Sequence, residues 1–169
     1  MNRLTTVLFI VYLLALCWIL LFKLGVQFSY MDNRNVNLIP FREALLYGGK
    51  VDVSETVSNA IIFIPLGIYT GILFYRWTVA RKLLLFFVVS LLVEGLQFVL
   101  AIGAFDSTDI VTNTAGGIIG WLIYKGIEKL FSNNGRAQRF INWVAFIGTV
   151  LMLVLLLLLK LNKLPIRYQ

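Results

Sequence analysis

Long apolar segments separated by short polar connections dominate the chain. Four of these segments are long enough to cross a bilayer, since a helix needs ~20 apolar residues to span the ~30 Å hydrocarbon layer. A fifth is weaker because Asn113 and four glycines interrupt it, but it still predicts a span. The five predicted transmembrane helices cover residues 4–22, 57–75, 83–102, 110–127 and 141–159. We therefore expect an all-α, polytopic membrane protein in which residues 1–169 form one compact five-helix bundle and a single domain.

Composition agrees with a chain embedded in lipid. Of the 169 residues, 60% are hydrophobic and only 14% are charged, and the mean hydropathy is +0.88. An ordinary globular domain carries about 25% charged residues. The sequence contains no histidine, which excludes Ser-His and Cys-His catalysis and zinc sites with histidine ligands. The single Cys17 lies in an apolar run, and we expect it to be a small core residue.

The net charge of +7 is distributed over connections at helix ends, which argues against nucleic-acid binding. Two connections hold most of it, with Arg76, Arg81, Lys82, Lys125, Lys129, Arg136 and Arg139. The connection 103–108 has no basic residue. By the positive-inside rule, the two basic connections face the cytoplasm, which predicts a multi-pass cell-membrane protein with a cytoplasmic N-terminus. Basic residues in the first outer connection and in the C-terminal tail oppose this orientation.

The connection 23–56 is the largest piece outside the predicted spans. Pro40 favours an extended conformation at Ile39 and prevents a helix from continuing through this point. Residues 37–41 are largely apolar. We expect this strip to lie at the lipid interface or to re-enter the bundle.

Polar residues inside the predicted spans indicate a candidate site. They occur in pairs three or four apart, so that each pair shares a helix face: Glu55 with Asn59, Glu94 with Gln97, and Asp109 with Asn113, with Asp106 just before the last pair. At a rise of ~1.5 Å per residue, Glu94 lies about 12 Å from the predicted outer end, and Asn59 and Asn113 about 3–6 Å. All three faces therefore fall in the outer half of the bilayer.

A carboxylate at such a depth costs ~2.5–3.5 kcal/mol on insertion scales, so Glu94 is expected to face the bundle interior or a wet cavity. This favours a polar pocket open to the outer leaflet and surrounded by membrane lipids. The alternative is an interhelical hydrogen-bond network that only fixes packing. Gly67 with Gly71, and Gly116 with Gly120, are small-xxx-small pairs that predict close helix approach.

The residues of such a pocket suit several ligands. Their carboxylate and amide oxygens suit a divalent cation such as Mg²⁺ or Ca²⁺, with Glu94, Asp106 and Asp109 as possible ligands. They equally suit a cationic head group, sugar hydroxyls or peptide amides. Arg34 or Arg42 could instead neutralise the acids. The pattern requires no cofactor and does not choose between these ligands.

Four segments carry a recognisable pattern: residues 37–41, 55–67, 94–98 and 106–117. Together they resemble the VanZ family of bacterial membrane proteins. The resemblance covers nearly the whole chain. It places the family's polar signature on Asn37, Asn59, Glu94, Gln97, Asp106, Asp109 and Asn113.

The resemblance implies a protein that lowers susceptibility to teicoplanin-type glycopeptide antibiotics. In that case the polar pocket engages the antibiotic or a lipid-linked cell-wall precursor. Another hypothesis is an enzyme that modifies a lipid-linked substrate, with Glu94 as acid/base and a carboxylate-bound divalent cation. A transporter with Glu94 as proton carrier and a scaffold for other envelope proteins are further alternatives. The sequence favours a non-enzymatic protein.

Overall fold

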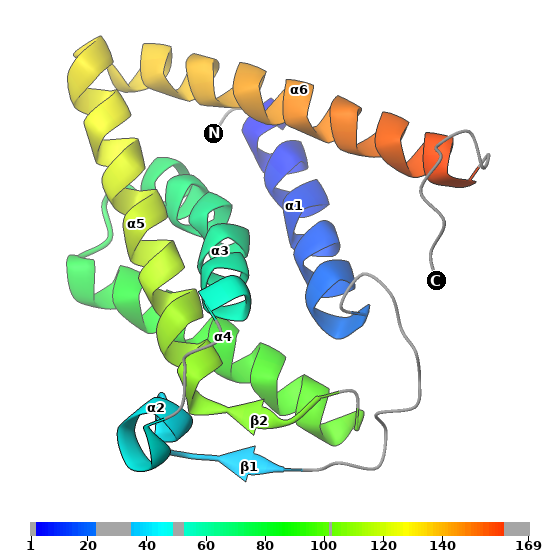
Figure 1. The fold of residues 1–169 in the computed structure, drawn as a ribbon. Helices are drawn as coiled ribbons and strands as arrows, with labels where there is room; N and C mark the ends of the chain where they lie inside the picture. Colours follow the sequence, from blue (N-terminus) through cyan, green and yellow to red (C-terminus); the bar gives the residue numbers. More distant parts are fainter. Residues whose placement is uncertain (1–2, 23–34, 49–52, 102, 161–169) are drawn as a thin grey trace.

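The computed structural model describes residues 3–22, 35–48, 53–101 and 103–160 (Figure 1). These residues form helices throughout, apart from two strands of two residues each. In chain order the elements are α1 (Arg3–Phe22), β1 (Val36–Asn37), α2 (Arg42–Tyr47), α3 (Val53–Leu73), α4 (Val79–Val99), β2 (Phe105–Asp106), α5 (Ser107–Phe131) and α6 (Asn134–Lys160). The all-α prediction is confirmed, with helices that begin about one turn earlier than predicted in α3, α4 and α5.

Several of these helices suit a membrane. By length and composition, Val53–Leu73, Val79–Val99 and Asn134–Val154 could each cross a bilayer, and Arg3–Trp18 is a shorter apolar helix. The weakest predicted span lies in α5, where Asp109, Asn113 and the glycines lower the hydropathy.

Helices α3 and α5 make the most extensive contact in the structure. Glycines allow it. A Cβ atom added to Gly116 would collide with the carbonyl oxygen of Ala60, and one added to Gly120 with that of Ile64. The two backbones therefore touch without intervening side chains, which confirms the packing role predicted for this glycine pair.

The apolar core is formed by α1, α3 and α4. Its largest members, Phe63 and Leu66 of α3 and Phe86 of α4, are almost fully buried. Phe86 packs over Gly117 of α5. The hydroxyl of Tyr12 in α1 donates to the carbonyl oxygen of Ile62 (2.9 Å), which ties α1 to α3.

The prediction for Cys17 is wrong, because this residue is exposed on the surface of the structure. Among residues 3–18 of α1, the buried positions are Thr5, Leu8 and Leu16. A single step along a helix turns the side chain by about 100°. Cys17 therefore points away from the core that Leu16 enters.

Helix α6 runs across the top of Figure 1, whereas α1, α3 and α5 run down it. Its main contacts are with α1 and α5. The change of direction follows from the tight turn before it, where Ser132 has a left-handed backbone (φ 48°) and caps α5. The side chain of Asn133 then accepts hydrogen bonds from the backbone of Gly135 (2.8 Å) and Arg136 (3.1 Å). The compact five-helix bundle expected from the sequence did not include this crossing.

The two strands pair in parallel, with Val36 opposite Phe105 and Asn37 opposite Asp106. The pairing holds the connection after α1 against the connection between α4 and α5, at the bottom of Figure 1. Leu38 and Ile39, which follow β1, are exposed. The apolar strip therefore lies on the surface at this end of the molecule, and its place relative to the lipid stays a prediction.

Candidate functional site

A hydrogen-bonded group of polar residues lies where β1, β2, α4 and α5 meet. We call Asn37, Glu94, Asp106 and Thr108 the strand-end cluster. The amide nitrogen of Asn37 donates to both carboxylate oxygens of Asp106, at 3.2 and 3.3 Å. The backbone nitrogen of Asp106 in turn donates to Oε2 of Glu94 (3.2 Å). Three elements, β1, α4 and β2, thus share one hydrogen-bonded chain, and Asn37 lies 69 residues from Asp106 in the sequence.

Asp106 has the central position because it directly precedes α5 and caps its first turn. Its backbone is extended (φ −119°, ψ 119°), and its Oδ1 accepts from the backbone nitrogen of Thr108 at 2.7 Å. This is an N-cap, which satisfies a helix N–H that has no partner within the helix. The hydroxyl of Thr108 accepts from the backbone nitrogen of Phe41 (3.0 Å) and so holds the segment after β1.

Asp106 lies in the electric field of a helix end. Its carboxylate lies at the N-terminus of α5, where the aligned peptide dipoles carry partial positive charge. The carboxylate of Glu94 reaches the same place from the buried face of α4, and its side chain is only 2% exposed. The strand-end cluster therefore brings two carboxyl groups to one end of the molecule.

A second polar contact continues from this cluster into the interior. Asn113 of α5 is 1% exposed, and its amide nitrogen donates to the hydroxyl of Ser90 (3.0 Å). Ser90 precedes Glu94 by four residues, so both lie on one face of α4. The Oδ1 atom of Asn113 is buried without a hydrogen-bond partner in the structure. An unsatisfied buried acceptor costs about 1–3 kcal/mol, which favours a water molecule or a ligand group at this position.

The other predicted site residues differ in how deeply they are buried. Gln97 is buried on α4, one turn after Glu94. Asn59 is half-buried on α3, beside the Ala60 backbone that contacts Gly116. Asp109 is half-buried in the first turn of α5, and Glu55 is exposed in the first turn of α3.

The structure offers no ready cation site in the described part of the chain. No group of three or more Asp, Glu or Cys side chains there is placed to hold a metal ion. The carboxylates of Glu94, Asp106 and Asp109 therefore do not form such a group. Of the two arginines considered as counter-ions, Arg42 is exposed on α2 and Arg34 lies outside the described residues.

Sequence reasoning missed two residues that complete these contacts, Ser90 and Thr108. Their signal was weak but present. Ser90 is one helical turn from Glu94 on the same face, and Thr108 follows Asp106 at the spacing of a capped helix start. Asn37 was indicated only by the family resemblance, and the pairing of β1 with β2 explains its place.

The sequence of the chain matches a known family. The VanZ/LLP1 family model matches residues 9–132, which include the whole strand-end cluster. The chain belongs to the VanZ/LLP1 family. This family member is 36% identical over 154 residues to Protein VanZ of Enterococcus faecium, covering 89% of the chain and 91% of that protein. No solved structure matches the chain.

Proposed function

We propose that this VanZ/LLP1 protein crosses the cell membrane five times, with its N-terminus in the cytoplasm and the strand-end cluster at the outer face. Three long apolar helices and the shorter apolar part of α1 support this topology. Helix α5 completes it, because its polar residues Thr112 and Asn113 are buried and the helix packs against α3 and α4. The basic turns between α3 and α4 and between α5 and α6 lie at the cytoplasmic side in this orientation.

The resistance role suggested by the family extends the proposal. The protein lowers susceptibility to teicoplanin-type glycopeptide antibiotics by engaging the drug, or a lipid-linked cell-wall precursor, at the outer leaflet. The observation that carries this assignment is the hydrogen-bonded chain of Asn37, Asp106 and Glu94. Glycopeptides and cell-wall precursors both display amide N–H and hydroxyl groups, which carboxylate and amide oxygens accept.

The arrangement also explains why an ionisable residue occupies the interior of α4. A network that serves packing alone needs only neutral amides or hydroxyls, and such contacts contribute ~0.6 kcal/mol each. Burying Glu94 costs more than this. The hydrogen bond from the backbone nitrogen of Asp106 offsets part of the cost, and a ligand that donates charge-assisted hydrogen bonds to the carboxylate adds to this.

The decisive experiment is expression in a susceptible host. Glu94→Gln and Asp106→Asn keep the shape of each side chain and remove its charge. Both are expected to return teicoplanin susceptibility to the level of the empty vector, while the protein still accumulates in the membrane. Vancomycin susceptibility is measured in parallel, because a selective shift distinguishes drug-specific action from general damage to the envelope.

Glu128→Gln is the matched control. Glu128 pairs with Lys125 (2.6 Å) at the opposite end of α5 and makes no contact with the strand-end cluster. This variant is expected to retain full resistance. Full resistance in both Glu94→Gln and Asp106→Asn would refute the assignment of the site.

A further inference from the structure

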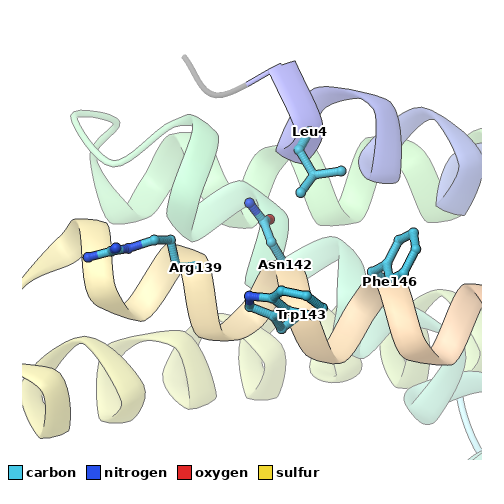
Figure 2. Close-up of a pocket in the computed structure, with 5 residues that line it drawn as sticks. All are labelled: Leu4, Arg139, Asn142, Trp143 and Phe146. Carbon is cyan, nitrogen blue, oxygen red and sulfur yellow. The ribbon is translucent and has the colours of Figure 1, made fainter.

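A cavity of about 220 Å³ lies between the start of α1 and the first half of α6. Figure 2 shows the five residues that line it, Leu4, Arg139, Asn142, Trp143 and Phe146. It lies at the end of the molecule where α6 crosses α1, away from the strands (Figure 1). The cavity is therefore distinct from the strand-end cluster.

A polar contact holds the two helices together beside the cavity. The hydroxyl of Thr5 and the side-chain amide of Asn142 exchange hydrogen bonds at 3.1 and 2.9 Å, and Gln138 donates to the same hydroxyl at 2.7 Å. Thr5 and Asn142 are both buried. The amide of Asn142 is therefore engaged with α1, and the other lining residues are three apolar side chains and one arginine.

Arg139 gives the cavity its charge. Its exposed side chain makes a long hydrogen bond (3.4 Å) from Nε to the carbonyl oxygen of Gly135. No acidic side chain lines the cavity. Arg136 lies one turn earlier on α6, and Arg3 precedes Leu4 on α1; both are exposed. Arg139 thus places a positive charge at the edge of the cavity, and Leu4, Trp143 and Phe146 give it apolar walls.

We propose that this cavity binds an anionic membrane phospholipid. The phosphate pairs with the guanidinium of Arg139, which suits bidentate phosphate contacts. Part of an acyl chain packs against Leu4, Trp143 and Phe146. The rings of Trp143 and Phe146 meet edge to face, with centroids 6.4 Å apart, and tryptophan is typical of the level of the lipid head groups. A cavity of this size is too small to enclose a whole lipid, so the lipid stays in its leaflet.

A lipid bound here contacts two helices that are separated by almost the whole sequence. Because a ligand that binds only the folded state stabilises it, the lipid is expected to strengthen the crossing of α1 and α6. The binding site thus makes the stability of the protein depend on anionic lipid. This role is independent of the antibiotic site.

Binding is tested with the purified full-length protein by native mass spectrometry, with phosphatidylglycerol and phosphatidylcholine as probes. The wild type is expected to bind phosphatidylglycerol more tightly. Arg139→Gln is expected to weaken that binding about fivefold, which corresponds to ~1 kcal/mol per basic residue, and to leave phosphatidylcholine binding unchanged. Arg81→Gln is the matched control, because Arg81 is an exposed arginine on α4 that does not line the cavity.

Equal loss in Arg139→Gln and Arg81→Gln would mean that only general surface charge attracts the lipid, and would overturn the proposal. So would unchanged binding in Arg139→Gln. A second measurement needs no variant. A phosphatidylglycerol with a photoreactive acyl chain is expected to cross-link the unmodified protein at residues 143–146 and at the start of α1. Cross-links spread evenly over the apolar helices would contradict the site.

Discussion

At the scale of single residues, Asp106 links the start of a helix to the candidate site. Its carboxylate caps α5 through Thr108 and accepts from Asn37, while its backbone nitrogen binds Glu94. Because Asp106 has both roles, removing its side chain changes the stability of the protein and the chemistry of the site at the same time. Two substitutions separate these effects.

Asp106→Ala removes the cap, and we expect it to lower the free energy of unfolding by about 0.5–2 kcal/mol. Asp106→Asn keeps a side-chain oxygen that caps equally well, so its stability is expected to stay near that of the wild type. Thermal unfolding of the purified protein in detergent measures both. Resistance is nevertheless expected to be lost in Asp106→Asn, because the negative charge is gone. A stable and fully resistant Asp106→Asn would contradict the role of its carboxylate.

The glycines of α5 provide a second test at this scale. Gly116→Ala places a methyl group against the backbone of Ala60, which cannot move aside as a side chain does. Overpacking of this kind typically costs about 1–3 kcal/mol, and we expect a corresponding fall in the unfolding temperature. The control is Gly126→Ala in the same helix, where a Cβ atom meets nothing within 4 Å. Equal unfolding temperatures in the two variants would argue against the close packing of α3 and α5.

At the scale of elements, the shortest ones position the site. Strands β1 and β2 have two residues each, yet their register sets Asn37 opposite Asp106. Helix α2 follows at once, and Phe41 between them has a left-handed backbone (φ 54°). Helices α4 and α5 hold Glu94 and Asn113 in place. The strand pair brings Asn37 to the same site.

The register of the pair can be tested by cross-linking in a Cys17→Ser background. Neighbouring strands lie ~4.8 Å apart, which is within the Cα separation of disulfides. Val36→Cys with Phe105→Cys is therefore expected to form a disulfide under mild oxidation, detected by mass spectrometry of proteolytic fragments. Leu38→Cys with Phe105→Cys is the control, because Leu38 is two residues beyond the paired position. Efficient cross-linking of the control pair alone would contradict the register.

At the scale of the whole molecule, the two ends differ in chemistry. The strand end gathers carboxylates and amides, and the other end gathers lysines and arginines. This polarity underlies both proposals, since one ligand site lies at each end. Together with the positive-inside rule, it also predicts the membrane topology.

Cysteine accessibility tests that topology in intact cells, again with Cys17→Ser. Ala104→Cys, in the connection before α5, is expected to react with a membrane-impermeant maleimide, because the proposed topology places it outside. Asn133→Cys, in the turn before α6, is expected to react only after the cells are opened. Both positions are exposed in the structure. The reverse pattern would invert the proposed orientation.

The crossing of α6 adds one more measurement. A reporter fused to the C-terminus is expected to face outward, because five spans bring the two termini to opposite sides. A cytoplasmic reporter would mean that α6 lies along the membrane surface, although its length and composition suit a span.

Much of this molecule could be predicted from its sequence. Apolar runs of ~20 residues have few alternatives to a helix in lipid, because every backbone group must be satisfied within the segment. The positions of α1, α3, α4, α5 and α6 followed from this rule. The same logic indicated Glu94, because an ionisable residue inside an apolar helix needs a partner.

Tertiary structure decided the rest. Two-residue strands have no periodicity to detect, and Asn37 meets Asp106 only because segments 69 residues apart pair in parallel. The exposure of Cys17 and the direction of α6 also depend on packing partners and on one left-handed turn at Ser132. Local sequence thus determined which segments are helices and which residues are costly to bury. The contacts between distant segments determined which of those residues meet.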